Sequence, residues 1–386
     1  MREGARACYA RAMRKMGPLL EESHDEGARM RFVAGIRGYI AGTVMPGARR
    51  VCDDDLAPAF EDKTGQAPDR RELRLMFENT AIYPWSSALR RTQQEMMWDV
   101  SGGMIERQWP VVAPSNVGSA TLRLDPGVTA PRYLTAVDIH CMPGNYHTEL
   151  TDNDAFAGAL YDHVIVTNGY KGDESAGVGA ALAAFVKRNF PDLAVARLLD
   201  MGCTVGHSTL AYSDAFPGAE IHAIDVAAPC LRYAKARADE AGATVHFSQQ
   251  NAEATDFPDG HFDLIVSTII LHETSNKAIR NLYRECRRLL RPGGVMLHCE
   301  SQQYFAKTPF DAQWHRWGAH FNAEPFMELM HETELKDLAV ECGFAPEKSF
   351  PQVPILAALG PGLDVVDNGA RPRTYPEILY VAGAIR

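Results

Sequence analysis

The stretch RLLDMGCTVGHSTL, residues 197–210, decides the fold of this chain. It opens with an apolar run that ends at Asp200, passes through Gly202 and Gly206, and then enters a segment with a helical pattern. A glycine-rich turn between a strand and a helix directs backbone N–H groups toward a ligand at the carboxyl edge of a parallel sheet. The stretch therefore predicts a ligand-binding turn in an α/β protein.

The residues around this turn repeat the alternation of strand and helix. Strand-like segments lie at 196–200, 219–225, 243–248, 262–267, 294–300, 344–350 and 376–385, and helical patterns lie at 207–216, 228–242, 276–290 and near 332–342. Gly242 and the run Pro292-Gly293-Gly294 end two of these helices. The pattern predicts an α/β fold with a doubly wound, mostly parallel seven-stranded sheet of the Rossmann-like kind.

The first 150 residues are less regular. Helical patterns occur within 70–107, and segments that resemble strands, interrupted by proline and glycine, run from 108 to 147. We expect a mainly helical accessory region over 1–160, which covers the substrate or forms a dimer, and a ligand-binding domain over 161–386.

Composition excludes several classes of protein. The 386 residues are 46% hydrophobic and carry a net charge of −10, so the chain is globular and lacks the basic surface of a nonspecific nucleic-acid binder. The eight cysteines form no CxxC pair, which disfavours zinc and disulfide frameworks and favours a reducing compartment. No stretch approaches the roughly 18 apolar residues of a membrane span. We expect a cytoplasmic protein without nucleic-acid or membrane partners.

The sequence of the turn excludes two common nucleotide-binding motifs and so narrows the choice of ligand. A P-loop requires a lysine after Gly206, and a dinucleotide fingerprint requires glycine where Thr204 stands, so both fail. Asp200 would also repel a pyrophosphate. S-adenosylmethionine instead carries an amino group and a sulfonium cation, which suit a carboxylate. Asp225 ends the next strand roughly twenty residues after Gly202, the spacing at which an acid accepts hydrogen bonds from ribose hydroxyls.

Four motifs extend this interpretation. LLDMGCTVGHST, AEIHAIDVAAPCL, SQQNAEATDFPDGHFDLIVSTIILHE and LYRECRRLLRPGG resemble, in order and spacing, the motifs of class I S-adenosylmethionine (SAM)-dependent methyltransferases. They are similar to those of the ubiquinone/menaquinone-biosynthesis type. The resemblance covers about 193–300, with 330–386 in outline. It implies an enzyme that transfers a methyl group from SAM to a small organic acceptor.

The resemblance also implies which residues hold SAM. Gly202 and Gly206 would line its methionine part, Asp200 would lie near its amino group, and Asp225 would hold the ribose. Asn251-Ala252 stands where the family has an acid–alanine pair facing the adenine, and Thr204 replaces the family's central glycine. The expected SAM site comprises Asp200, Gly202, Cys203, Thr204, Gly206, Asp225, Val226, Asn251, Ala252 and Thr268.

Catalytic and acceptor residues are less sharply indicated. His272, beside Glu273 at the end of the fourth strand, is a candidate general base, and its alternative role is to shape the SAM pocket or cap the next helix. Two stretches, 140–170 and 313–326, are rich in aromatic and histidine residues and are candidates for the acceptor pocket, with core packing as the alternative. The acceptor candidates are His140, His147, Tyr161, Tyr170, Trp314, Trp317 and Phe321. The spacing of His140, Cys141 and His147 matches no zinc pattern, and we expect no metal.

Three other functions stay open on the sequence. An RNA or protein methyltransferase would present a basic or grooved surface, and a catalytically silent SAM-fold interaction protein would be expected to lose Asp200 and Asp225. A dehydrogenase would bind NAD in place of SAM. The acceptor atom and a homodimeric state are not determined.

Overall fold

The sheet is the centre of the molecule. The computed structural model describes residues 21–109, 118–167, 174–355 and 379–386. Its strands are β1 (Thr121–Arg123), β2 (Arg197–Met201), β3 (Glu220–Asp225), β4 (His246–Gln249), β5 (Phe262–Thr268), β6 (Leu290–Ser301), β7 (Ser349–Pro354) and β8 (Leu379–Ile385). They form one eight-stranded sheet in the order β1-β4-β3-β2-β5-β6-β8-β7, in which β8 runs antiparallel to both of its neighbours.

The strand order reverses at β2. From β2 the chain moves through β3 to β4 on one side, whereas β5 and β6 lie on the other side. In open α/β sheets, ligands bind at such a reversal, beyond the carboxyl ends of the strands. The loops that follow β2 and β5 are therefore placed where a ligand site is expected.

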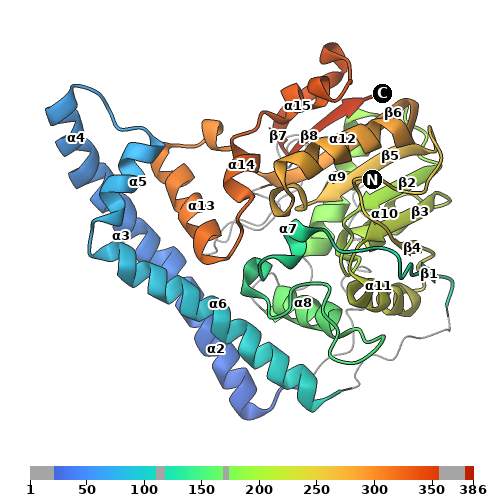
Figure 1. Cartoon of the computed structure of the whole chain (residues 1–386), viewed down its shortest axis with the longest axis horizontal. Coiled ribbons are helices and arrows are strands. Elements are labelled where there is room, and N and C mark those ends of the chain that lie inside the picture. The colour runs from blue at the N-terminus through green and yellow to red at the C-terminus, as the bar shows by residue number, and fades with distance from the viewer. Residues whose placement is uncertain (1–20, 110–117, 168–173, 356–378) are drawn as a thin grey trace.

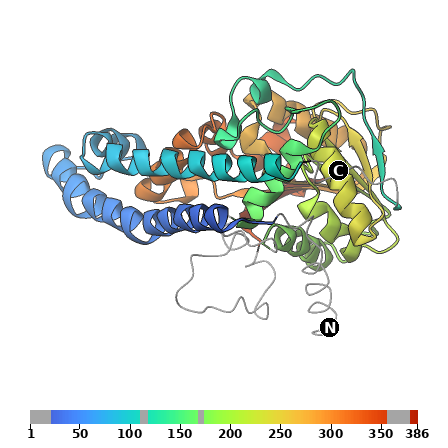
Figure 2. The same cartoon turned by 90° about the horizontal axis from the view of Figure 1, so that it is seen from below.

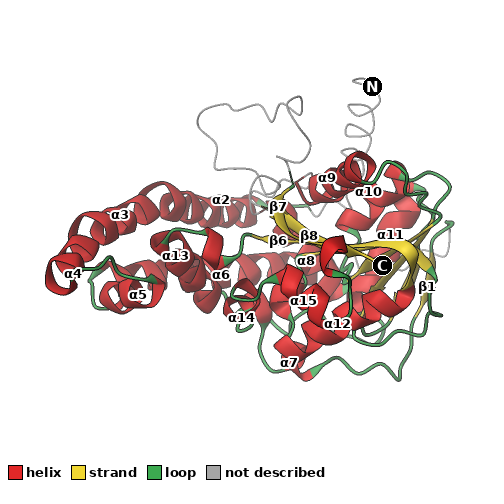
Figure 3. Ribbon diagram, turned by 90° about the horizontal axis from the view of Figure 1, so that it is seen from above, coloured by secondary structure: helices red, strands yellow, loops and turns green. Residues whose placement is uncertain are grey.

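Helices cover both faces of the sheet (Figure 3). Because side chains alternate along a strand, Leu198 and Leu199 of β2 enter different cores. Leu198 belongs to the core beneath α9 (Glu174–Asn189), α10 (His207–Ala215) and α11 (Ala228–Ala241). Leu199 belongs to the core beneath α12 (Asn276–Leu289) and α15 (Leu335–Glu341). The predicted doubly wound α/β architecture is confirmed.

A long helical arm extends from the sheet domain (Figure 1). Its outgoing part winds continuously through α2 (His24–Tyr39), η1 (Ile40–Val44), α3 (Met45–Arg50), η2 (Val51–Leu56) and α4 (Ala57–Thr64). Gly65, in the left-handed conformation, ends it, and a capping box on Asp69 begins α5 (Arg70–Glu78). The 26-residue α6 (Ile82–Arg107) then returns beside α2 (Figure 2). The expected mainly helical N-terminal region is present.

The remaining elements connect the arm to the sheet domain. They are α7 (Arg132–Thr135), η3 (Ile139–Cys141), α8 (Phe156–Thr167), η4 (Leu271–Glu273), η5 (Tyr304–Ala306), α13 (Pro309–Phe321), α14 (Met327–His331) and η6 (Pro346–Lys348). Helix α13 packs against α5 and α6 of the arm, and α8 packs against α6 and α11. The arm is therefore packed against the sheet domain through α13 and α8.

The structure differs from the sequence predictions in three places. Strand structure within the described part of 108–147 is limited to β1, because prolines at 126, 131 and 143 remove backbone donors around short helical turns. β1 pairs with the edge of β4 and adds an eighth strand to the predicted seven. The strand predicted at 344–350 begins only at Ser349, after a 3-10 turn that starts at Pro346.

The division at 160/161 stays a prediction, and α8 runs across it. Within the described ranges, no helix has both the length and the apolar character needed to cross a bilayer.

Candidate functional site

The loop between β2 and α10 has the backbone that its glycines require. Gly202, Thr204 and Gly206 all have positive φ angles, of 73°, 46° and 76°. A Cβ on Gly202 would lie 2.3 Å from Cδ1 of Ile270, so a larger residue would have to displace that side chain as well as adopt a positive φ angle. Gly206 is the N-cap of α10. Thr204 adopts the left-handed conformation despite its β-branched side chain, which makes this loop a strained one.

Asp200 is buried at the carboxyl end of β2. Its Oδ2 accepts a hydrogen bond of 2.6 Å from Oγ1 of Thr209 on α10. Burial, together with the charge of nearby Asp225, raises the pKa of Asp200 to about 7 although the bond from Thr209 opposes the shift. A cation bound beside this carboxyl group would favour its ionised form.

Asp225 is anchored at the end of β3. Its two carboxylate oxygens accept hydrogen bonds of 2.9 Å from the backbone N–H groups of Thr204 and Ala227. Burial raises the pKa of Asp225, and these two backbone bonds oppose the shift. The carboxylate is thus fixed between the glycine loop and the start of α11, with further lone pairs for a ligand.

Asn251 follows β4 at the same edge of the sheet. Its Oδ1 accepts a hydrogen bond of 2.9 Å from the backbone N–H of Glu253, which closes a local turn. Asn251 and Ala252 both line the cavity described next. The amide oxygen that the sequence offered to an adenine is already engaged in this turn, so the adenine role of Asn251 stays a prediction.

One cavity, with a volume of about 570 Å³, joins these loops to the helical arm. Of the residues predicted from the sequence, it is lined by Asp200, Gly202, Cys203, Thr204, Asp225, Val226, Asn251, Ala252, Thr268, His272, His140, Tyr161, Trp314 and Trp317. The lining does not include Gly206, His147 or Phe321. Gly206 caps α10, and Phe321 packs against Tyr83 of the arm. Tyr170 lies outside the described residues.

His272 forms a buried pair with Glu300. Its Nδ1 lies 2.7 Å from Oε2 of Glu300, whose other oxygen accepts from the backbone N–H of Leu271. Burial by itself lowers the pKa of His272, but the charge and hydrogen bond of Glu300 outweigh it and raise the pKa to about 9. The pair fixes the imidazole at the cavity wall, with Nδ1 engaged and Nε2 as the second ring nitrogen.

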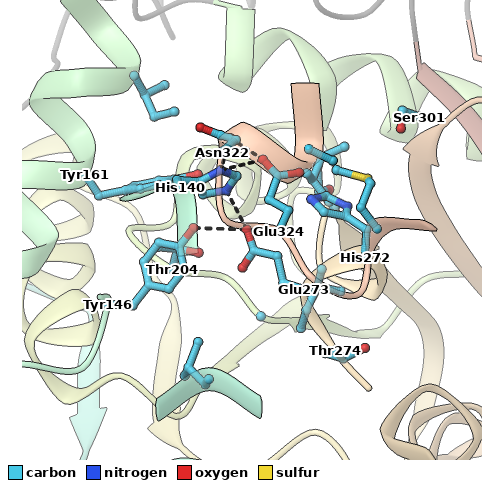
Figure 4. Close-up of a pocket in the computed structure, with 18 of the residues that line it drawn as sticks. His140, Tyr146, Tyr161, Thr204, His272, Glu273, Thr274, Ser301, Asn322 and Glu324 are labelled. Carbon is cyan, nitrogen blue, oxygen red and sulfur yellow. Dashed lines mark hydrogen bonds and ion pairs between the residues drawn. The ribbon is translucent and has the colours of Figure 1, made fainter. Parts of the chain in front are cut away.

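A second histidine, His140, joins three distant segments (Figure 4). Its Nε2 lies 2.7 Å from Oε1 of Glu273, and its Nδ1 lies 2.9 Å from Oε1 of Glu324. The hydroxyl of Tyr146 donates to Glu273 at 3.0 Å. Burial opposes protonation, but the charge of Glu324 and the hydrogen bond to Glu273 raise the pKa of His140 well above its ordinary value. The two carboxylates therefore favour the protonated form of His140.

The backbone at His140 is also held tightly. His140 and Cys141 both have φ angles of 58°, which is uncommon for residues other than glycine. The His140 carbonyl accepts hydrogen bonds from Nε2 of Gln94 at 2.9 Å and from Nε1 of Trp98 at 2.6 Å. Helix α6 therefore fixes the segment that carries His140.

Sequence reasoning missed Glu300, Glu324 and Tyr146, which contact these histidines or Glu273. Glu300 ends a buried strand at the ligand edge of the sheet, and that position is a signal that could have identified it. Glu324 and Tyr146 have no such signal, because their contacts join residues far apart in the chain. Within the described ranges, no group of three or more His, Cys, Asp or Glu side chains is arranged to hold a metal ion.

In a comparison with known proteins, residues 198–294 match the model of a family described as "Methyltransferase domain". The chain is 34% identical over 106 residues to a demethylmenaquinone methyltransferase of Thermus thermophilus, an alignment that covers 27% of this chain and 46% of that protein. It is 30% identical over 158 residues to a ubiquinone biosynthesis O-methyltransferase of Cereibacter sphaeroides. That alignment covers 39% of this chain and 60% of that protein. The structure of a SAM-dependent methyltransferase from Aquifex aeolicus superposes with a TM-score of 0.35 at 14% identity, covering 54% of this chain and 97% of that chain.

The family match and the two curated relatives confirm the resemblance to class I SAM-dependent methyltransferases over the segment that carries the motifs. The chain spans about half the length of the curated relatives it matches. The helical arm lies outside the matched family segment.

Proposed function

We propose that the protein is an enzyme that transfers a methyl group from SAM to a small organic molecule. The observation that carries this proposal is that two carboxylates and a histidine line the same cavity. Asp200 and Asp225 lie at the ends of adjacent strands and line the cavity. His272, which is paired with Glu300, lines the same cavity. The acids suit a cationic nucleoside, and the histidine suits an acceptor that must lose a proton.

The chain's own groups fit SAM. Asp200 would bind the α-amino group, which would favour the ionised carboxylate, and Asp225 would accept from the ribose hydroxyls. When bound, SAM supplies an electrophilic methyl group on a sulfonium. The arm and the segment around His140 would exclude water and align the acceptor, which are the main requirements of this displacement.

The size and walls of the cavity support a small acceptor. Its volume of about 570 Å³ falls within the roughly 300–1,000 Å³ of small-molecule pockets. His272 would take the proton of an attacking hydroxyl or amine on Nε2, while Glu300 holds Nδ1 and stabilises the imidazolium that forms. The proton would then pass from His272 to solvent when the product leaves.

The proposal is tested by binding and turnover together. Calorimetry should detect binding of SAM and S-adenosylhomocysteine, and transfer of a radiolabelled methyl group should follow when a panel of phenols, catechols and aromatic amines is added. A folded protein that binds neither nucleoside would refute the proposal. Binding without transfer to any acceptor would favour the catalytically silent alternative.

A first prediction concerns the pH dependence of SAM affinity. Since the pKa of Asp200 is about 7 in the unliganded protein, this carboxyl is increasingly protonated as the pH falls below 7 and must lose its proton to bind an ammonium group. We expect SAM affinity to fall between pH 7.5 and 5.5, approaching about tenfold per pH unit at the acidic end. Calorimetry across this range would measure it.

Asp200→Asn provides the control for this prediction. The variant should bind SAM more weakly at neutral pH, and its affinity should vary much less over the same pH range because the titrating group is gone. An equally steep pH dependence in Asp200→Asn would assign the titration to another group.

A further inference from the structure

One face of helix α6 forms a wall of the cavity far along the chain from the SAM-binding loops. The residues on this wall follow one another at helical spacing, and they are Arg90, Gln93, Gln94, Met97 and Trp98. Ile40 of η1 and the α13 tryptophans, Trp314 and Trp317, line the same cavity. The cavity therefore continues from the ligand edge of the sheet into the helical arm.

Gln93 stands out on this wall. Its side chain is fully buried, and neither Oε1 nor Nε2 has a hydrogen-bond partner. The next residue, Gln94, also lines the cavity but donates its Nε2 hydrogen to the His140 carbonyl. Since buried amides are nearly always hydrogen-bonded, a donor and an acceptor left together on a cavity wall indicate the place of a polar ligand group.

Two tryptophans on this wall already donate their indole N–H groups to other parts of the protein. Nε1 of Trp98 donates to the His140 carbonyl, and Nε1 of Trp317 donates to Oγ of Ser87 at 2.9 Å. Trp314 and Trp317 stack with ring centroids 4.2 Å apart. With the N–H groups of Trp98 and Trp317 engaged, these two indoles offer flat apolar surface to a ligand.

We propose that this part of the cavity is an acceptor subsite, in which the tryptophans contact an aromatic body and Gln93 binds a carboxamide-like group at its distal end. The subsite rests on the proposed methyl transfer, because it assigns the acceptor's chemical class. A carboxamide both accepts and donates hydrogen bonds, so it can pair with both Oε1 and Nε2 of Gln93. A carboxylate offers acceptors only and would leave Oε1 unpaired.

The test uses para-substituted phenols as probes. One series carries a carboxamide separated from the ring by one to three methylene groups, a second carries the matching carboxylate, and a third carries the branched alkyl group of the same shape, as in para-isobutylphenol. Binding is measured by calorimetry to protein saturated with S-adenosylhomocysteine. At one spacer length, wild type should bind the carboxamide at least about fivefold more tightly than its alkyl and carboxylate counterparts, and Gln93→Leu should remove this preference.

Gln313→Leu is the matched control. Gln313 of α13 is also buried with an unpartnered Nε2, but it does not line the cavity, so its replacement should keep the probe preference. Thermal melting adds a readout that is independent of the probes. Gln93→Leu should melt at the same or a higher temperature than wild type, because it removes an unsatisfied buried amide.

Several results would overturn the subsite. They are no carboxamide preference at any spacer length, the same preference in wild type and Gln93→Leu, or a melting temperature several degrees lower in Gln93→Leu, which would show a structural amide. A carboxylate preference that survives in Gln93→Leu would instead assign recognition to a cationic side chain and would also overturn it. Failure to bind S-adenosylhomocysteine at all would refute the proposed function, so the two failures are distinguishable.

Discussion

Asp225→Ala is expected to weaken binding of SAM and S-adenosylhomocysteine by at least about tenfold, and by roughly a hundredfold if both ribose hydroxyls bind the carboxylate. Hydrogen bonds to charged groups contribute about 1.5–3 kcal/mol each, and about 1.4 kcal/mol is a tenfold change in affinity. The Asp225 carboxylate already lies at the cavity wall, held by backbone N–H groups of Thr204 and Ala227. Calorimetry with both nucleosides measures the loss.

Because Asp225 also holds two loops, its replacement needs a structural control. Asp263 at the start of β5 similarly accepts from two backbone N–H groups, those of Ala196 and Arg197, but it does not line the cavity. Asp225→Asn and Asp263→Asn should both lower the melting temperature, whereas only Asp225→Asn should weaken nucleoside binding. Unchanged binding in Asp225→Ala would remove the ribose assignment.

His272→Ala is expected to lower the methyl-transfer rate by about 10²-fold or more, with SAM affinity within a few-fold of wild type. Since Glu300 raises the pKa of His272 to about 9, the ring is mostly protonated at neutral pH. Its neutral fraction grows as the pH rises, so kcat/KM of wild type should increase up to about pH 9 before it levels off. Steady-state kinetics between pH 6 and 10 measures this profile.

Glu300→Gln tests the same assignment through the pKa. Without the Glu300 charge, the burial that lowers the pKa of His272 is opposed only by the charges of Glu324 and Glu273. The pKa should therefore fall, and kcat/KM should level off at a lower pH than in wild type. His298→Gln is the control, because His298 is a fully buried histidine bonded to Ser267 that does not line the cavity. Its profile should match wild type. Equal losses of rate and SAM affinity in His272→Ala would indicate a residue that shapes the pocket.

The residues that the sequence assigned to the acceptor pocket fall into two groups, those that line the cavity and those that do not. His140 and Tyr161 line the cavity from the first stretch, and Trp314 and Trp317 line it from the second. Trp317 also bonds to Ser87 of α6, so it serves packing and cavity wall together. His147 and Phe321 do not line the cavity.

The sequence by itself determined the sheet domain and the ligand-binding edge. Buried parallel strands are continuous apolar runs, and left-handed turns favour glycine at positions such as Gly202 and Gly206. Both features can therefore be recognised from residues that are neighbours in the sequence. Asp200 and Asp225 could be placed for the same reason, because the ends of adjacent parallel strands meet at one edge of the sheet. Even there, the 3-10 turn at Pro346 and the pairing of β1 with β4 were not predicted.

Only the tertiary structure decided how the cavity is closed. His140 meets Glu273 and Asn322 across 133 and 182 residues of chain, and Gln93 reaches the same cavity from the helical arm. The arm's continuous helix through 24–64 carries Gly35, Gly38, Gly42 and Gly47, which weaken any helical pattern in the sequence. Contacts between such distant segments depend on how whole helices pack, and a hydrophobic pattern specifies which face of a helix is buried but not which helix covers it.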